Sequence, residues 1–370
     1  MNNHQVNKNH SAQWDAIRGC SMLIMILIDL SNVVGWQPLF FNWIFFAFPV
    51  IEPIFFLSGF LICWRTTQYV LNHPQKLTSI MKLYVQRRML RTWPLYFLIV
   101  ITVFIVPSLA EGPLVKPFWR FATFTMNVDL WPPSGLSTYW SLCVEEWCYL
   151  AFLLLVPFLR FKSINYVFIS LALLSLVVRA NIVLSHGALG IMDYLSLIHF
   201  STLAHWDAFW WGCVMGHFYP SLRTLSTRTR LYFLAAGFTS LVLYFVLVFA
   251  YGPTLLAIRQ VINPFFGIIA AAGFVLGMEA IPASWLARTG IVQFGIMSYS
   301  FYLLHRIFMH GFIRFNRHYQ LVNEGGWLEL SLCLAFLLLA GSIFYAVFER
   351  PILKLLNNKF SFRRTLESKS

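Results

Sequence analysis

The first apolar segment carries two charged residues whose types and spacing could support chemistry inside a membrane. The run WDAIRGCSMLIMILIDL (14–30) holds Arg18 near its start and Asp29 eleven residues later. A charge at the centre of a membrane helix costs roughly 2.5 to 3.5 kcal/mol on insertion scales, so intramembrane charges are candidates for function. Eleven helical residues place both side chains on one face, about 16 Å apart along the axis. We expect this face to line a polar path from the membrane surface inward. The alternative is that Arg18 extends its charge to the surface and Asp29 caps a helix end.

A third charge interrupts the next apolar run. Glu52 and Pro53 precede FFLSGFLI (55–62), in which Ser58 and Gly59 are small enough to let two helices pack closely. A carboxylate inside a membrane needs a partner or a proton. Glu52 is therefore a candidate site residue. Close packing is the expected role of Gly59 and Ser58, and Ser58 is also kept as a site candidate.

Two adjacent carboxylates lie in TYWSLCVEEWCYL (138–150). Glu145 and Glu146 follow Trp140 and Ser141 by about one helical turn, and we take all four as site candidates. Adjacent helix positions point about 100° apart, so the two glutamates are expected to face different neighbours. Glu145 is the candidate for a catalytic role.

Arginines cluster in RRMLRTWPLY (87–96), which we expect to be a loop at the inner membrane surface. Arg91 is about one helical turn from both Arg87 and Arg88. The planar guanidinium is suited to phosphate groups, so the three residues are candidate phosphate ligands. The alternative is a role in topology and in contacts with anionic lipid headgroups.

Polar residues on the later apolar segments complete the candidate set. They are His205 and Asp207 in HWDAFWWG (205–212), and Tyr299, Tyr302 and His305 in SYSFYLLH (298–305). Ser298, Tyr302 and His305 recur at i, i+4 and i+7 and so form one polar stripe. Histidine is the usual proton-transfer group near neutral pH, although a lone membrane histidine is more often a packing residue. Glu349 in FERP (348–351) ends the last apolar run, and we interpret it as an interfacial anchor.

Composition defines the elements that must position these residues. Of the 370 residues 59% are hydrophobic and only 11% are charged, whereas soluble domains carry about 25% charged residues. This predicts an all-α integral membrane protein, a polytopic bundle of about ten transmembrane helices. The expected spans are 16–36, 42–64, 94–110, 139–159, 164–184, 199–219, 231–251, 261–279, 290–312 and 328–348. Six cysteines without a CxxC pair indicate neither a disulfide framework nor a metal site.

The net charge of +13 predicts the orientation of the bundle. Most basic residues cluster between alternate apolar runs, which is the pattern of cytoplasmic loops rather than of nucleic-acid binding. Both termini are therefore expected to be cytoplasmic, with a tail at 1–13, a transmembrane domain at 14–350 and a basic tail at 351–370. The exceptions to the charge rule are Lys116, Arg120, Arg314 and Arg317, which fall on the outer side.

The ordered motifs resemble the membrane acyltransferase family 3. The segments that carry the resemblance are DAIRG, FFLSGFLI, RRMLRTWPLY, YWSLCVEEWCYL, HWDAFWWG, SYSFYLLH and FERP. They cover nearly the whole chain, and WSLCVEE and FFLSGFLI are the most specific. The resemblance implies an enzyme of the bacterial inner membrane that moves an acetyl group, with succinyl as an alternative, from cytoplasmic acetyl-CoA to a sugar hydroxyl. The implied acceptor is a surface polysaccharide such as lipopolysaccharide O-antigen, free or lipid-linked. No metal is implied.

The resemblance also implies roles for individual residues. Arg18 matches the arginine of the family's first helix, and Arg87, Arg88 and Arg91 match arginines that meet acetyl-CoA. Glu145 and Glu146 match the acid pair. His205 stands where many members have an arginine before the residue that is Asp207 here.

Asp29 is the main departure from the family pattern, which places a histidine there. A water-exposed aspartate is a poor base at neutral pH, so Asp29 could act as a base only if burial made it more basic. As an acyl carrier it would have to form a mixed anhydride, which argues against that route. Otherwise His205 or His305 supplies the base. Two competing hypotheses remain. The first is a proton-coupled transporter that uses Glu52, Asp29 and Glu145; the lack of an inverted repeat argues against it. The second is a catalytically altered family member with a binding or regulatory role.

Overall fold

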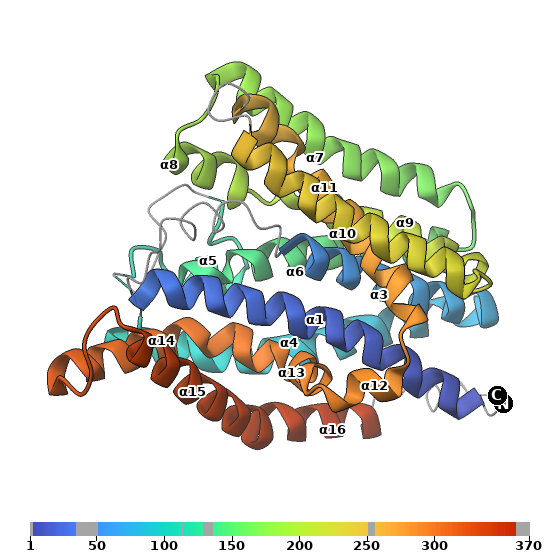
Figure 1. Ribbon diagram of the computed structural model, residues 1–370. Helices are drawn as coiled ribbons and strands as arrows, with labels where there is room; N and C mark the ends of the chain where they lie inside the picture. Colours follow the sequence, from blue (N-terminus) through green and yellow to red (C-terminus); the bar gives the residue numbers. More distant parts are fainter. Residues whose placement is uncertain are drawn as a thin grey trace.

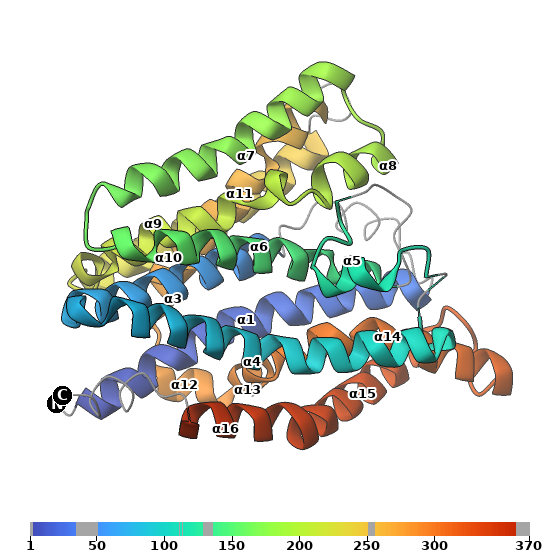
Figure 2. The same cartoon turned by 180° about the vertical axis from the view of Figure 1, so that it is seen from behind.

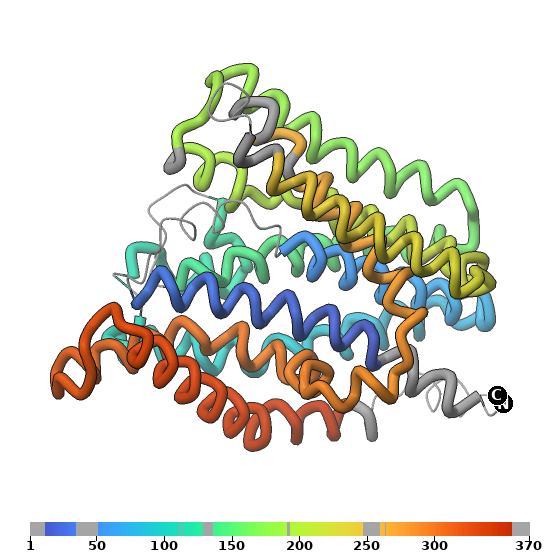
Figure 3. The backbone as a smooth tube through the Cα atoms, viewed as in Figure 1, coloured from blue at the N-terminus to red at the C-terminus, as the bar shows by residue number. Residues whose placement is uncertain are grey.

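The computed structural model describes residues 3–34, 51–110, 112, 114–128, 136–250 and 256–359. Figure 3 follows the backbone through these ranges. No strand occurs in them, and the all-α architecture is confirmed. Parts of the predicted segments lie outside the described residues: the first two residues of the N-terminal tail, the end of the span 16–36 after residue 34, the start of the span 42–64 up to residue 50, the last residue of the span 231–251, and the C-terminal tail after residue 359.

Ten long helices form the body of the bundle in the described ranges. They are α1 (Asn3–Val34), α3 (Ile51–Asn72), α4 (Leu77–Ile105), α6 (Trp140–Leu155), α7 (Ile164–His186), α9 (Asp207–Leu222), α10 (Thr227–Ala250), α11 (Leu256–Gly277), α14 (Ser298–Tyr319) and α15 (Trp327–Phe344). Short helices connect or extend them: α5 (Phe118–Ala122), α8 (Ile191–Tyr194), α12 (Ala283–Arg288), α13 (Ile291–Ile296) and α16 (Arg350–Lys359).

Eight helices of the described chain are long and apolar enough to cross a membrane. The protein is therefore an integral, multi-pass membrane protein. The other two expected spans, 199–219 and 290–312, fall on α9 and α14. The helix α9 has 16 residues, short of the roughly 20 that a bilayer requires, and α14 carries arginines and histidines along its length.

The helices lie roughly side by side, with α1 in the middle (Figure 1). On one side of α1 are α3, α6 and α9, followed by α10, α11 and α7; on the other side are α4, α14 and α15, as the view from behind also shows (Figure 2). The helix α3 packs along α9, and α1 packs along α13 and α14. The start of α1 and the end of α16 lie at the same end of the bundle (Figure 1). We call this the inner end, because the basic loops predict it to face the cytoplasm, and the opposite end the outer end.

Gly59 explains how α3 and α9 approach each other so closely. A Cβ atom at Gly59 would overlap the backbone carbonyl of Phe209, and one at Gly212 would overlap the carbonyl of Phe56. The backbones of the two helices are therefore in direct contact. The packing role predicted for Gly59 is confirmed.

The helix α4 begins 17 residues before the predicted span 94–110. The segment with Arg87, Arg88 and Arg91 is thus part of a helix, and its prediction as a loop is wrong. Residues 77–92 are rich in Leu, Met, Lys, Gln and Arg, which favour helix. Pro94 lies inside the helix without ending it.

Candidate functional site

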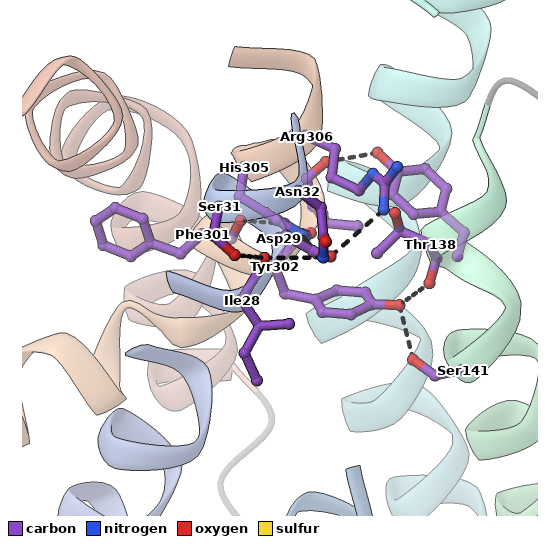
Figure 4. Close-up of polar contacts among 12 residues, drawn as sticks. Ile28, Asp29, Ser31, Asn32, Thr138, Ser141, Phe301, Tyr302, His305 and Arg306 are labelled. Atoms are coloured by element: carbon purple, nitrogen blue, oxygen red, sulfur yellow. Dashed lines mark hydrogen bonds and ion pairs between the residues drawn. The ribbon is translucent and has the colours of Figure 1, made fainter. Parts of the chain in front are cut away.

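Asp29 of α1 faces His305 and Arg306 of α14 (Figure 4). Its Oδ2 atom lies 3.0 Å from Nε2 of His305, and its Oδ1 atom lies 3.5 Å from a terminal nitrogen of Arg306. Asp29 is 7% exposed and His305 is 1% exposed. The carboxylate of the first helix and the histidine of the later polar stripe, 276 residues apart in sequence, therefore form one buried pair.

The hydrogen bonds of Nδ1 determine which ring nitrogen of His305 faces Asp29 and which one carries a hydrogen. Nδ1 lies 2.8 Å from the carbonyl oxygen of Tyr302 and 3.1 Å from that of Phe301. A carbonyl oxygen only accepts, so Nδ1 must donate its hydrogen there. This leaves Nε2 as the atom that can exchange a proton. Because a carboxylate oxygen also only accepts, the 3.0 Å contact between Nε2 and Asp29 requires a proton between the two atoms.

Tyr302 links this pair to α6. Its hydroxyl donates to the carbonyl of Thr138 and lies 2.7 Å from the hydroxyl of Ser141, which donates to it (Figure 4). Ser141 is one helical turn before Glu145. The structure thus brings Asp29, Tyr302, His305 and Ser141 together, as a row of polar side chains across α1, α14 and α6.

Glu145 lies next along this row but does not contact Asp29 in the described structure. One of its carboxylate oxygens accepts from the hydroxyls of Ser58 (2.6 Å) and Tyr149, and Arg88 lies 3.3 Å from the same atom. The guanidinium of Arg88 also stacks 3.4 Å over the Tyr149 ring. Arg88 is therefore held inside the bundle by a carboxylate and an aromatic ring, which does not fit its expected position as a surface phosphate ligand. The partners of Glu145 are thus Ser58 of α3, Arg88 of α4 and Tyr149 of its own helix.

Glu146 faces a different neighbour, as predicted from the helical spacing. It accepts hydrogen bonds from the hydroxyl of Thr92 (3.1 Å) and the indole nitrogen of Trp93 (3.3 Å), both on α4. The hydroxyl of Tyr299 donates to the carbonyl of Thr92 at 2.5 Å. Glu146 and Tyr299 therefore both hold α4, one from α6 and the other from α14.

A group of arginines gathers toward the inner end, on three helices. Arg18 pairs with Asp15 one turn before it at 2.7 Å, and it lies within electrostatic range of Arg65 of α3 and Arg91 of α4. Arg87 lies within range of both Arg65 and Arg91. Arg65 was counted in the sequence only as a loop charge. Its position at the end of an apolar run is the signal, and its convergence with Arg18 depends on the packing of α3.

Asp207 forms a second buried pair, away from His305. Its Oδ2 atom lies 2.5 Å from Arg179 of α7, and both side chains are almost completely buried. Arg179 also donates to the carbonyls of Val261 (3.0 Å) and Ala204 (2.5 Å), so it joins α7, α9 and α11. Glu52, at the start of α3, lies within electrostatic range of the pair. The sequence analysis missed Arg179, although a lone arginine in the run SLVVRANIVL is detectable by its insertion cost alone.

His205 has aromatic neighbours and no contact with His305 in the described residues. Its ring packs against Trp140 and His199, with centroid distances of 5.4 and 5.6 Å. It is buried and has no contact with Asp29 in the described structure. This position makes a packing role the better assignment for His205 and Trp140.

Glu349, predicted to be an interfacial anchor, is directed into the bundle. It is 2% exposed and accepts hydrogen bonds from the backbone nitrogen of Ser300 at 3.1 Å and from the Ser300 hydroxyl. The π-helical turn Tyr345–Glu349 directs the carboxylate inward. Glu349 thereby caps the start of α14, the helix that carries His305.

Residues 11–347 match the sequence model of acyltransferase family 3, whose description is an acyltransferase domain. The match spans nearly the whole bundle, including every site residue named above except Glu349. The chain therefore belongs to this family of membrane acyltransferases. The searches of curated proteins and of solved structures found no match.

Proposed function

We propose that the protein transfers an acetyl group from acetyl-CoA, bound toward the inner end, to a hydroxyl of a cell-surface saccharide that enters from the outer end. The observation that carries the proposal is the contact between His305 and Asp29. It supplies a buried histidine with a carboxylate partner in a chain whose family transfers acyl groups. Histidine is the side chain that most often serves as a general base. Unlike in a catalytic triad, the carboxylate here faces Nε2, because Nδ1 is bonded to backbone carbonyls.

His305 is the base in this proposal, and Asp29 is its partner. The proton that lies between Nε2 and the carboxylate first passes to water, and the acceptor hydroxyl takes its place beside Nε2. The hydroxyl then donates its proton to Nε2 while its oxygen attacks the thioester carbonyl carbon. A C–O bond forms, the C–S bond breaks, and the CoA thiolate leaves and takes up the proton held by Nε2 of His305. Asp29 stabilises the imidazolium that forms when His305 takes the hydroxyl proton, so the aspartate in the family's histidine position keeps a role in proton transfer.

The arginine group supports the location of the donor. Arg18, Arg65, Arg87 and Arg91 bring four guanidinium groups together at the inner end, where the phosphates of CoA would be bound. The rise along α1 from Arg18 to Asp29 is about 16 Å. The part of acetyl-CoA between its phosphates and its thioester would have to extend over about this distance to bring the thioester to His305.

Glu145 and Arg88 receive a structural role in this proposal. Three donors already engage one carboxylate oxygen of Glu145, which leaves it poorly placed to take a proton from a substrate. The pair holds α3, α4 and α6 at a fixed spacing along the route between the arginine group and Tyr302.

The two competing functions lose part of their support. A catalytically silent member was suggested by the absence of a histidine in the first helix, and His305 now stands opposite that position. A proton relay through Glu52, Asp29 and Glu145 requires these groups to be neighbours, whereas Glu52 lies near Arg179 and Asp207.

The test is transfer by the purified, full-length protein in lipid nanodiscs, with radiolabelled acetyl-CoA and a surface glycan from the source cells. We expect label on the glycan with the wild type and only background label with His305→Gln. The variant Asp193→Asn, which changes an exposed carboxylate on α8, is the matched control. Proton-coupled uptake without acetyl-CoA, or equal labelling by wild type and His305→Gln, would overturn the proposal.

A further inference from the structure

Four basic residues on α14 run from the His305–Asp29 pair to the outer end. They are Arg306, His310, Arg314 and Arg317. At 100° per residue, Arg306, His310 and Arg317 fall within about 40° of one another, with Arg314 beside them. Basic residues are normally depleted on the outer side of a membrane protein, so this basic stripe on α14 departs from that rule, as Lys116 and Arg120 also do.

Exposure increases along the basic stripe. His305 is 1% exposed, the side chain of Arg306 is 26% exposed, and that of Arg317 is 60% exposed. The stripe therefore connects the buried His305–Asp29 pair to the solvent-exposed outer end. Arg306 makes this connection directly, because it contacts the carboxylate of Asp29.

The arginines supply the charges of the stripe. Arg314 donates to the backbone carbonyls of Ser108 and Ala110, which carry no net charge. His310 lies within electrostatic range of Arg306, Arg314 and Arg317, which disfavour its protonation, so it contributes a neutral imidazole whose Nε2 atom has no hydrogen-bond partner in the described part of the chain.

Arg317 pairs with Glu324 at 3.2 Å, but both side chains are 60% exposed. Such surface pairs contribute little to stability and exchange readily.

We propose that the basic stripe binds an acidic group, a carboxylate or a phosphate, carried by the saccharide acceptor. The acidic group would lie along the exposed Arg314 and Arg317, with His310 beside them as a neutral hydrogen-bonding group, while a hydroxyl of the same molecule reaches His305. This inference rests on the proposed function and deepens it by naming the acceptor class as an anionic saccharide. Charge complementarity and the direct connection to Asp29 support this occupant over a lipid headgroup, which has no need to reach the buried pair.

The test measures binding without any acyl donor, so that its outcome is independent of transfer. The probes are trigalacturonic acid and its methyl ester, which has the same hydroxyls without the charges. The full-length protein is embedded in nanodiscs of phosphatidylcholine, and affinities are measured by calorimetry at low salt. We expect the acid to bind at least about fivefold more tightly than the ester, the effect of two exposed ion pairs, and the preference to disappear at 1 M salt, where the screening length is about 3 Å.

Two variants and one change of lipid composition test whether the stripe is the binding site. The double variant Arg314→Gln/Arg317→Gln should bind the acid no better than the ester, while Arg160→Gln, which changes an exposed arginine at the inner end, should keep the wild-type preference. Equal binding of acid and ester by the wild type, or a preference that survives in the double variant, would overturn the inference. So would loss of the preference in nanodiscs containing phosphatidylglycerol, because a lipid phosphate would then be the occupant. A failure here leaves acetyl transfer in the wild type intact, whereas failure of the proposed function leaves this binding unchanged.

Discussion

Replacing Asp29 with asparagine tests the site most directly, because it removes the charge and leaves the shape nearly unchanged. In the wild type the carboxylate lies 3.0 Å from Nε2 of His305 in a buried position. Hydrogen bonds to charged groups contribute about 1.5 to 3 kcal/mol, which corresponds to roughly 10- to 150-fold in rate. The amide of asparagine can in addition donate to Nε2 and occupy the lone pair that the base needs. We therefore expect Asp29→Asn to lower kcat by about 100-fold.

The assay is transfer of radiolabelled acetyl groups at saturating acetyl-CoA. The KM for acetyl-CoA should not change, because the arginine group lies about 16 Å away along α1. The thermal unfolding temperature of each variant shows whether it is folded, and Asp193→Asn should match the wild type in every measurement. The double variant Asp29→Asn/His305→Gln should be no slower than His305→Gln alone, since the two residues act as one unit. Asp29→Asn with kcat within about threefold of the wild type, where loss of this hydrogen bond predicts at least about tenfold, would refute the assignment of the dyad.

Three further substitutions test other parts of the structure. Arg65→Gln should raise the KM for acetyl-CoA about tenfold through loss of one charge-assisted hydrogen bond, whereas Arg228→Gln, an exposed arginine at the same end, should not; equal KM values would remove Arg65 from the donor site. Gly59→Leu should prevent a stable fold, because overpacking costs about 1 to 3 kcal/mol or more and here the neighbouring atoms are backbone; a monodisperse variant with the wild-type unfolding temperature would contradict the close packing. Asp207→Asn should destabilise the protein by about 3 to 5 kcal/mol, because it leaves Arg179 buried without its partner. For that variant, unchanged thermal stability would argue against the buried pair.

Much of the architecture follows from hydropathy. The insertion cost of charges and the length of a bilayer predict the apolar spans, and the structure contains helices at all ten positions within its described ranges. Hydropathy failed where helices continue through polar sequence. The first part of α4 carries arginines and was expected to be a loop, although its residues favour helix as strongly as the apolar part does.

The candidate site was predicted as residues but not as contacts. Helical periodicity correctly placed Glu145 and Glu146 toward different neighbours, because that relation is local. It could not pair Asp29 with His305, which depends on how α1 packs against α14. The contact of Glu349 with Ser300 of α14 could not be predicted for the same reason, because its position at the end of an apolar run does not say which helix it faces.

Tyr302 has a consequence for the tightness of the membrane. A row of polar side chains that extends from the arginine group to the outer end would conduct protons if water could follow it. The hydroxyl of Tyr302 is bonded to both Thr138 and Ser141, and Glu145 and Asp29 both lie within electrostatic range of it. A proton relay needs a hydroxyl that is free to reorient, and this one is held by its two partners. Tyr302 would thus block proton conduction along the row. The proton gradient across the membrane would then be preserved although the donor and the acceptor approach from opposite ends of the bundle.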